Sequence, residues 1–317
     1  MLPSVADTTL SDEQIQVGSV VMGSGTPYII TGFNPWDGSD VVSNDATLGA
    51  RPGVISGYNV YRSRAITFTV VIAGSPDTKA VTQSLGAALR VAMSPQNYDI
   101  PLHFMLGGNQ YFVMGRPRTV RADMKRWGAG HLTFECRFLA TDPRIYEYGL
   151  NTTTGSAYVS TSSGLNFNTA SGAGSIGAID FHSSGSLTGY LDLLGSSTTP
   201  DAPASAYNSG TVSTPWQLQI TPNDSTAVSG LVITHVESGS KLALSSIVLA
   251  YGTTLYLDSS DHAVLTNTGG NSQFTSARNL LSSDSTWWDL QVGSNTFQMD
   301  VSTGTANATL YWYTIEV

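Results

Sequence analysis

Side chains that could bind a metal ion occur together in two short segments. The segment DSSDH, residues 258–262, places two carboxylates and an imidazole within five positions. Asp258 and Asp261 are three residues apart in an expected hairpin turn, where Asp and Ser are ordinary residues. The segment HVE puts His235 and Glu237 on one face of a strand, with no third ligand nearby. We therefore expect turn and strand residues here, and no metal site.

The sequence motifs that are typical of nucleotide binding and of covalent catalysis are incomplete in this chain. The segment GAGSIG (172–177) fits G-x-G-x-x-G, but no buried strand precedes it, and helix breakers follow it in AIDFHSSGSLTG. The chain has no Ser-His-Asp order, no G-x-S-x-G elbow and no convincing pair of catalytic carboxylates. We predict no catalytic residue and no cofactor, and we expect the protein not to be an enzyme.

Adjacent tryptophans occur in STWWDLQVGSN (285–295), where they could stack on a sugar ring or fill a core. If the segment is extended, Trp288, Leu290 and Val292 share one face, and Trp287 lies on the other. One tryptophan is then a core residue beside Leu290, and the other lies against the adjoining surface or a neighbouring subunit. This structural interpretation is the one that we prefer.

Composition bounds the architecture. At 317 residues, the chain is expected to hold two domains, 1–150 and 151–317. Charged residues are only 12% and glycines number 32, a mixture that favours short strands and turns over helices. Cys136 is the single cysteine, so neither a disulfide framework nor a cysteine metal site is expected.

Charge is distributed unevenly. Residues 1–148 contain 12 basic and 12 acidic residues, whereas the rest contains only Lys241 and Arg278 against 11 acidic residues. An acidic second half disfavours nucleic acid and anionic membranes, although it could serve solubility alone. No stretch approaches 18 apolar residues, and MLPSVADTTL lacks the features of a signal peptide. We expect a soluble protein that is made in a cytoplasm.

Hydrophobic alternation predicts strands in the first half at TPYIITGF, RAITFTVVIAG, IPLHFML, QYFVMGRPRTV and HLTFECRFLA. The connection 34–59 is too rich in Gly, Asp, Asn and Pro for regular structure throughout, and its length indicates a functional or interface role. Residues 77–93 predict a helix capped by Asp77 or Thr78. Its apolar stripe is Val81, Leu85, Ala88, Leu89 and Ala92. Residues 151–215 predict short strands in long loops, and closely spaced strands from Trp216 onward predict an antiparallel sandwich or barrel.

Several of these segments, taken in order, resemble distal tail proteins of siphophages and the related minor tail proteins of actinobacterial phages. In the second half they are NSGTVSTPWQLQI, GLVITHVESGSKLAL, YGTTLYLDSSDHAVL, STWWDLQVGSNTF and the aromatic final strand LYWYTIEV. In the first half the Asp-rich loop, Arg-Pro-Gly turn and strand of ITGFNPWDGSDVVSNDATLGARPGVISGYNVYRSRAITFTVVIAG match the family, as does FLATDPRIYEY. The resemblance is weakest over 151–207, and TPNDSTAVSG is more polar than the family's usual loop.

The resemblance implies a mainly β structural virion protein of the tail tip. Its N-terminal split β-barrel with one α-helix would close a hexameric ring, and its C-terminal galectin-like antiparallel β-sandwich would point outward. Expected partners are other copies of the chain, the tail tube protein, the tape measure protein and tail-associated hub proteins. The ring would join the tail tube to the tail tip or baseplate. The alternative is a carbohydrate-binding adhesion module, in which Trp216, Tyr256 and Trp287 stack on a host surface glycan.

A basic cluster and two isolated tryptophans are the candidate subunit interface. Arg116, Arg118, Arg121, Lys125 and Arg126 fall within 11 residues and are opposed only by Asp123. Contact with nucleic acid or a solvated hairpin face could explain them. We prefer ion pairs with Asp37, Asp40 or Asp45 of a neighbouring subunit, because DNA that slides through a tail would be held back by tight basic rings. Trp36 and Trp127 stand in polar, turn-prone segments and are the candidate apolar anchors, with local packing as the alternative.

Overall fold

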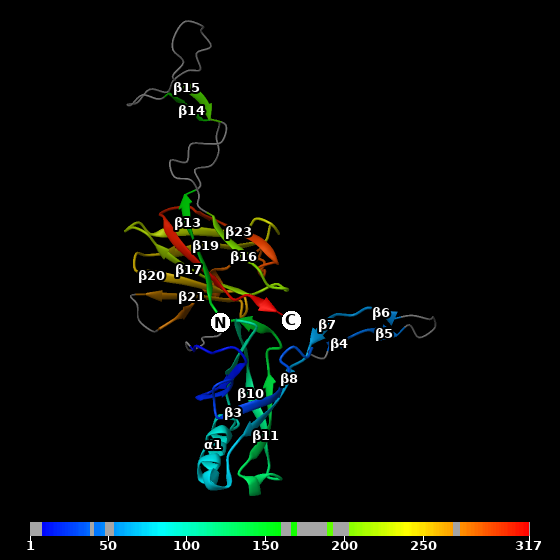
Figure 1. The fold of residues 1–317 in the computed structure, drawn as a ribbon. Coiled ribbons are helices and arrows are strands. Elements are labelled where there is room, and N and C mark those ends of the chain that lie inside the picture. Colours follow the sequence, from blue (N-terminus) through cyan, green and yellow to red (C-terminus); the bar gives the residue numbers. More distant parts are fainter. Residues whose placement is uncertain are drawn as a thin grey trace. The chain divides into compact units, whose positions relative to one another are not determined.

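The chain is described by a computed structural model that covers residues 8–38, 41–47, 54–159, 166–169, 189–192, 203–268 and 273–316. It is mainly β with one α-helix, as the sequence predicted, and it divides into two compact units (Figure 1). Pro3–Asn151 forms most of the first unit, and Thr152–Asn208 with Pro215–Trp312 forms most of the second. Ser209–Thr214 and Tyr313–Val317, which the sequence division places in 151–317, fold with the first unit.

Seven strands of the first unit pair antiparallel in the order β2-β1-β9-β10-β11-β8-β3. The end strands β2 and β3 contact each other, so the sheet curls round its own core. Strand β12 pairs with β10 and with β25, which brings the end of the chain into this unit. The bounds are β1 Gln14–Val17, β2 Val20–Gly23, β3 Tyr28–Phe33, β8 Arg64–Ile72, β9 Ile100–Leu106, β10 Asn109–Asp123, β11 Leu132–Ala140, β12 Ile145–Glu147 and β25 Ile315–Glu316.

Side-chain alternation decides which face of the central strands is buried. In β8 and β11 every second residue enters the core, and the residues between them stay at least partly accessible. The buried set contains Ile66, Phe68, Val70, Ile72, Leu132, Phe134, Cys136 and Phe138, as predicted. Burial raises the pKa of the Cys136 thiol to about 12, so this residue is a small core side chain and an unreactive one.

The helix α1 spans Lys79–Ala92 and follows a short 3-10 turn at Pro76–Thr78. Its start is organised one turn earlier than predicted, because the backbone N–H of Ser75 donates to Thr78 Oγ1 at 2.7 Å. Neither Asp77 nor Thr78 therefore serves as the side-chain cap of α1 that the sequence suggested.

The buried stripe of α1 also differs from the predicted one. Val81 and Ala88 are exposed, whereas Thr82, Gly86 and Leu89 are buried. An added Cβ at Gly86 would lie 2.8 Å from Leu132 Cδ2 and 3.0 Å from Phe134 Cζ. The helix therefore packs on the sheet through its small residues, which shifts the buried face by one position relative to the apolar stripe.

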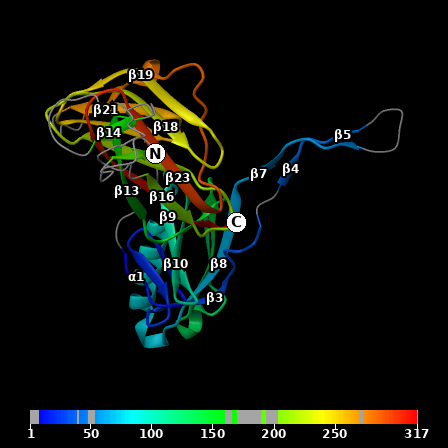
Figure 2. The same cartoon turned by 90° about the horizontal axis from the view of Figure 1, so that it is seen from above.

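The described strands within residues 34–62 form a two-stranded ribbon, and we call this segment the arm. Strand β4 (Val41–Ser43) pairs with β7 (Asn59–Tyr61), and β5 (Ala46–Thr47) pairs with β6 (Val54–Ile55). The arm extends the β3–β8 hairpin and leads away from the body of its unit (Figure 2). The connection that the sequence predicted to be partly irregular is therefore largely a ribbon in its described part.

The second unit is a β-sandwich. Its strands follow the order β19-β18-β23-β13-β24-β17-β20-β21-β22, with β16 beside β23. Pairing between β13 and β23 is parallel, which departs from the predicted purely antiparallel arrangement. The bounds are β13 Asn151–Val159, β16 Ala204–Asn208, β17 Trp216–Pro222, β18 Val228–His235, β19 Lys241–Leu249, β20 Thr253–Asp258, β21 Ala263–Thr268, β22 Thr275–Ser276, β23 Gly293–Val301 and β24 Ala306–Trp312, with a separate pair β14 Asn166–Thr169 and β15 Gly189–Asp192.

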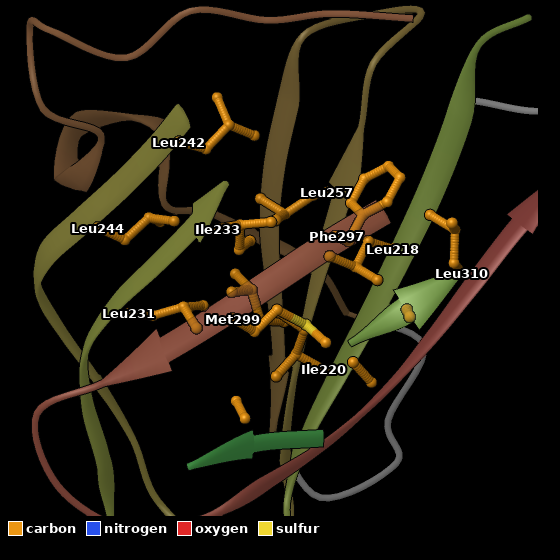
Figure 3. Packing of buried hydrophobic residues seen from close by; sticks show 14 of the residues in the cluster. Leu218, Ile220, Leu231, Ile233, Leu242, Leu244, Leu257, Phe297, Met299 and Leu310 are labelled. Carbon is orange, nitrogen blue, oxygen red and sulfur yellow. The ribbon is translucent and has the colours of Figure 1, made fainter. Parts of the chain in front are cut away.

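The core of the sandwich lies between two layers of strands. Leu218 and Leu310, on β17 and β24, face Ile233, Phe297 and Met299, on β18 and β23 (Figure 3). Each of these side chains is almost completely buried, and burying one such side chain stabilises the fold by about 1.5–3 kcal/mol.

Candidate interaction surfaces

A groove of about 490 Å³ lies on the outer face of the β10-β11-β8-β3 part of the first sheet. This face carries the residues that alternate with the core, so its lining is rich in hydroxyl and charged groups. Thr67 lies opposite Arg137, and Glu135 lies opposite Arg121. The polar side chains of the lining include Thr67, Thr69, Thr119, Arg121, Glu135 and Arg137.

The pairing register shifts once in each of two strands that border this groove. The register of β3 shifts between Ile30 and Gly32, and that of β10 shifts between Pro117 and Thr119. Without the shift in β10, Arg118 would face Arg137 on the neighbouring strand. With it, Thr119 faces Arg137 and Arg121 faces Glu135, which replaces a repulsive cross-strand pair by an attractive one.

The basic cluster is divided between internal and exposed roles. Arg116 Nε lies 2.5 Å from Asp99 Oδ1, so Arg116 has an ion-pair partner within its own chain, and its pairing with a neighbour's loop stays a prediction. Burial alone would raise the pKa of Asp99, but hydrogen bonds from Thr141 and Arg116, with the charges of Arg116 and Arg118, hold that pKa below its usual value. Arg118 and Arg121 are exposed and have no ion pair with any described residue.

The acidic candidates lie in the arm or at its root. Asn34 Nδ2 donates to Asp37 Oδ1 at 2.7 Å. The backbone N–H of Gly57 donates to Asp45 Oδ1 at 2.8 Å, and hydrogen bonds from Ser43 and Gly57 lower the pKa of this exposed carboxyl. Asp45 therefore joins the two sides of the arm and stays ionised. Asp40 lies outside the described residues.

The two candidate anchor tryptophans have different surroundings. Trp36 packs edge-on against Tyr111 and Phe104, with ring centroids 5.3 and 6.1 Å apart, yet 43% of its surface is exposed. Local packing and an accessible apolar face are thus both present at Trp36. Trp127 begins a 3-10 turn at Trp127–Ala129 and is half-buried.

Arg64 is a residue at the root of the arm that the sequence analysis missed. Its side chain is 2% exposed, and Nη1 donates to the carbonyl of Pro35 at 2.8 Å. Burial lowers the pKa of the guanidinium, and the nearby charge of Asp37 opposes that shift. The signal was its position, because Arg64 continues the buried alternation of Ile66 and Phe68.

The adjacent tryptophans of the second unit are structural. Trp288 is 8% exposed beside the fully buried Leu290, as the alternation predicted. Trp216 is completely buried, and its Nε1 donates to the carbonyl of Trp288 at 2.9 Å. Val292, predicted to share this face, is instead 56% exposed, because the regular alternation ends before the turn into β23.

The same packing removes most of the predicted sugar-stacking surface. Trp216 has no accessible surface, which corrects its assignment as a candidate glycan-stacking residue. Trp287 packs against the core, and the ring of His262 stacks on it with centroids 5.2 Å apart and 17° between the planes. Tyr256 is half-buried and packs edge-to-face with Phe274 at 5.3 Å. Of the three candidate stacking residues, Tyr256 is the one that is partly accessible and lies outside the packed tryptophan cluster.

The acidic and histidine segments have structural roles. Asp258 accepts hydrogen bonds from Gln217 Nε2 at 2.6 Å and from the backbone and hydroxyl of Ser260, which closes the β20–β21 turn. His235 is buried, with Nδ1 2.7 Å from Ser238 Oγ and Nε2 3.1 Å from Asn295 Oδ1. Among the described residues, no group of three or more His, Cys, Asp or Glu side chains is arranged to hold a metal ion.

Within the described parts of the chain, no helix combines the length and the apolarity that crossing a membrane requires. The segment GAGSIG lies outside the described residues.

The chain is similar to known proteins in part of its sequence and in its fold. Residues 209–314 match the family described as siphovirus-type tail component, C-terminal domain. The fold is similar to that of the SPP1 Dit protein, described as a paradigm of the hub adsorption apparatus in phages that infect Gram-positive bacteria. The TM-score is 0.57 and the identity 11%, over 89% of this chain and 92% of that chain. A chain of the phage P2 baseplate in its activated conformation with Ca gives a TM-score of 0.49 at 10% identity, over 94% and 97%. No curated protein matches the sequence.

Proposed function

Because residues 209–314 match the C-terminal domain of siphovirus-type tail components, we propose that this chain is a distal tail hub protein. In this proposal it is a structural component of the virion tail, and it acts by assembly without catalysing a reaction. Copies of the chain form a hexameric ring that joins the tail tube to the tail tip or baseplate. The tail tube protein, the tape measure protein and tail-associated hub proteins are the proposed neighbours of the ring.

The arm is the part of the structure that gives this proposal its main support. Among the described residues its four strands pair only with one another, and no further layer covers either face of the ribbon. An isolated two-stranded ribbon is marginally stable in water, and apolar residues on it are accessible. A ribbon of this kind is best explained as an element that is completed by another protein surface.

A closed ring needs two different patches on each copy, because each copy contacts one neighbour on either side. The first unit offers a projecting arm (Figure 2) and an open groove whose lining includes Asn34 at the root of the arm. The first half of the sequence has balanced charges, whereas the acidic second half favours separation of neighbouring second units. These features support a ring that is built through the first unit.

The ring is tested by measuring the mass of the purified full-length protein by light scattering over a range of concentrations. We expect a species six times the mass of the 33.5 kDa chain. Trp36→Ala, which removes an accessible aromatic side chain at the root of the arm, should weaken association by about tenfold or more. Tyr251→Ala, at a 69% exposed tyrosine of the second unit, is the matched control and should leave assembly unchanged.

A protein that stays monomeric at every concentration would contradict the ring. Trp127→Ala provides a second test of the predicted anchors. If Trp36→Ala and Trp127→Ala proteins both form rings of wild-type stability, the apolar anchors have been assigned to the wrong residues.

A further inference from the structure

We propose that Arg64 is a receptor for the carboxylate of Asp37, and that exchange of this carboxylate between Asn34 and Arg64 sets the direction of the arm. The root of the arm then has two arrangements. The structure holds Asp37 on Asn34, and the second arrangement holds it on Arg64. We call this pair of arrangements the latch. It concerns a single chain and does not depend on the ring.

The first step is the guanidinium of Arg64, which is buried and only partly used. The side chain is 2% exposed, and Nη1 donates to the carbonyl of Pro35 at 2.8 Å. Nε and Nη2 are buried as well, and neither has a hydrogen-bond partner among the described residues. A buried charge is stabilised when its remaining donors are paired, so this guanidinium favours the approach of an acceptor.

The second step is the chemistry that these two donors select. Nε and Nη2 lie on the same edge of a guanidinium, and their parallel N–H groups match the two oxygens of a carboxylate. The same chain shows this pairing at Arg144, whose Nε donates to Asp142 Oδ1 and whose Nη2 donates to Asp142 Oδ2, each at 2.8 Å. The Nε–Nη2 edge of Arg64 therefore favours a carboxylate over a carbonyl or a hydroxyl group.

The third step identifies the carboxylate as that of Asp37. The negative charge of Asp37 acts on Arg64, where it opposes the lowering of the guanidinium pKa by burial. Opposite charges act in this way from within about 4–6 Å. In the structure, Asp37 is exposed and its Oδ1 accepts from Asn34 Nδ2 at 2.7 Å. A rotation at Asp37 therefore exchanges a neutral, exposed partner for a charged, buried one.

The fourth step is the freedom of the chain at this point. On one side of Asp37, the Trp36 ring packs edge-on against Tyr111, with centroids 5.3 Å apart. The backbone N–H of Trp36 also donates to Asn34 Oδ1 at 3.3 Å. On the other side, Gly38 has open space where a Cβ would lie, and a glycine allows the backbone to turn there. Such a turn changes the direction in which the arm leaves the body of its unit.

The latch also spans both sides of the root. Arg64 is the first residue of β8, and Pro35 follows the end of β3, so the guanidinium joins the two strands from which the arm extends. An arm that is held at one angle loses less conformational freedom on association than an arm that moves freely. This consequence for assembly rests on the proposed ring, whereas the latch itself does not.

The experiment measures the distance between two spin labels on the full-length protein, diluted with unlabelled protein so that only distances within one chain are recorded. The labels are attached to Ser43→Cys in the arm and Ala87→Cys on the exposed face of α1, and the single native cysteine is buried. We expect two distance populations. Asp37→Asn should remove one of them. Asn34→Ala, which removes the competing donor, should increase that same population by about twofold or more.

Two further variants isolate the contact. Asp45→Asn is the matched control, because Asp45 is an exposed carboxylate of the arm that the backbone N–H of Gly57 holds at 2.8 Å, and it should leave both populations unchanged. Arg64→Lys keeps the charge but lacks the two-donor edge, and it should remove the same population as Asp37→Asn.

A single population in the unsubstituted chain, or two populations that Asp37→Asn leaves unchanged, would overturn the latch. A population that Asp37→Asn removes and Arg64→Lys keeps would mean that another group receives the carboxylate. These distances belong to one chain, so a failure of the latch leaves the mass of the assembled ring unaffected, and the two proposals fail separately.

Discussion

Trp36 and Trp288 show how the two units use the same side chain differently. Both residues stand in turn-prone sequence, and both pack against other aromatic rings. Trp288 is 8% exposed inside the sandwich, whereas Trp36 keeps 43% of its surface accessible at the root of the arm. The indole of Trp288 is therefore satisfied inside the second unit, whereas that of Trp36 leaves part of its apolar surface for a partner.

This difference implies that the stability of the monomer and the stability of the assembly depend on different residues. Apolar area that is buried within one chain stabilises the monomer, and accessible apolar area is stabilising only after association. Substitutions in the second unit should act mainly on folding, and substitutions in the arm should act mainly on the ring.

Trp288→Ala should give the largest change. Removing a buried indole loses its transfer free energy and leaves a cavity, which together cost about 3–5 kcal/mol. In urea unfolding followed by circular dichroism, the transition of the second unit should move to lower denaturant and that of the first should not. Val292→Ala, at an exposed position nearby, is the control. Equal losses for both variants would mean that Trp288 is not a core residue.

His103 should make the first unit sensitive to acid. It is 4% exposed on β9, and burial lowers its pKa from 6.5 to about 4. Because the folded pKa lies below the unfolded one, the unfolded chain binds the proton first. The stabilisation is complete above about pH 6.5 and falls as the pH approaches 4, by on the order of 3 kcal/mol.

Unfolding of the first unit, measured at a series of pH values, checks this linkage. His103→Gln should flatten the pH dependence between 6.5 and 4, and the exposed His262→Gln should keep the wild-type slope. If the slope survives in His103→Gln, another group is responsible for it.

Gly86→Val should have the smallest of these effects on folding. The new Cβ would approach Leu132 Cδ2 and Phe134 Cζ to 2.8 and 3.0 Å, and overpacking of this kind costs about 1–3 kcal/mol. Ala87→Val, at an exposed position of the same helix, carries the intrinsic cost of valine without the clash. Thermal unfolding of both variants gives the difference, and equal melting temperatures would contradict close packing at Gly86.

Strand identity and the inward faces could be predicted from the sequence because they depend on alternation along one segment. Ile66, Phe68, Cys136 and Trp288 were placed in cores by this rule, and the structure confirms them. Helix α1 shows its limit. Val81 fits the apolar period but is exposed, because contact with the sheet is made through Gly86. Which side of a helix packs depends on the shape of the surface that it meets.

The candidate interface shows the same division more clearly. The basic cluster was visible in the sequence, but the pairing of Arg116 with Asp99 joins residues 17 positions apart across the strand pair β9–β10. The groove depends on strands β3, β8, β10 and β11, which come from widely separated parts of the chain. No local pattern reveals that Arg121 and Arg137 lie on one face together.

The amino-acid sequence alone was enough to predict a mainly β protein with a helix near residues 77–93, the residues that alternate inward, and the net negative charge of the second half. Those properties follow from side-chain polarity and local spacing. The three-dimensional fold was needed to show that the described strands between residues 41 and 61 form a projecting ribbon, that Arg64 is buried at its root, and that the end of the chain returns to the first unit. These features depend on which distant strands pair, and pairing is selected by the packing of the whole chain.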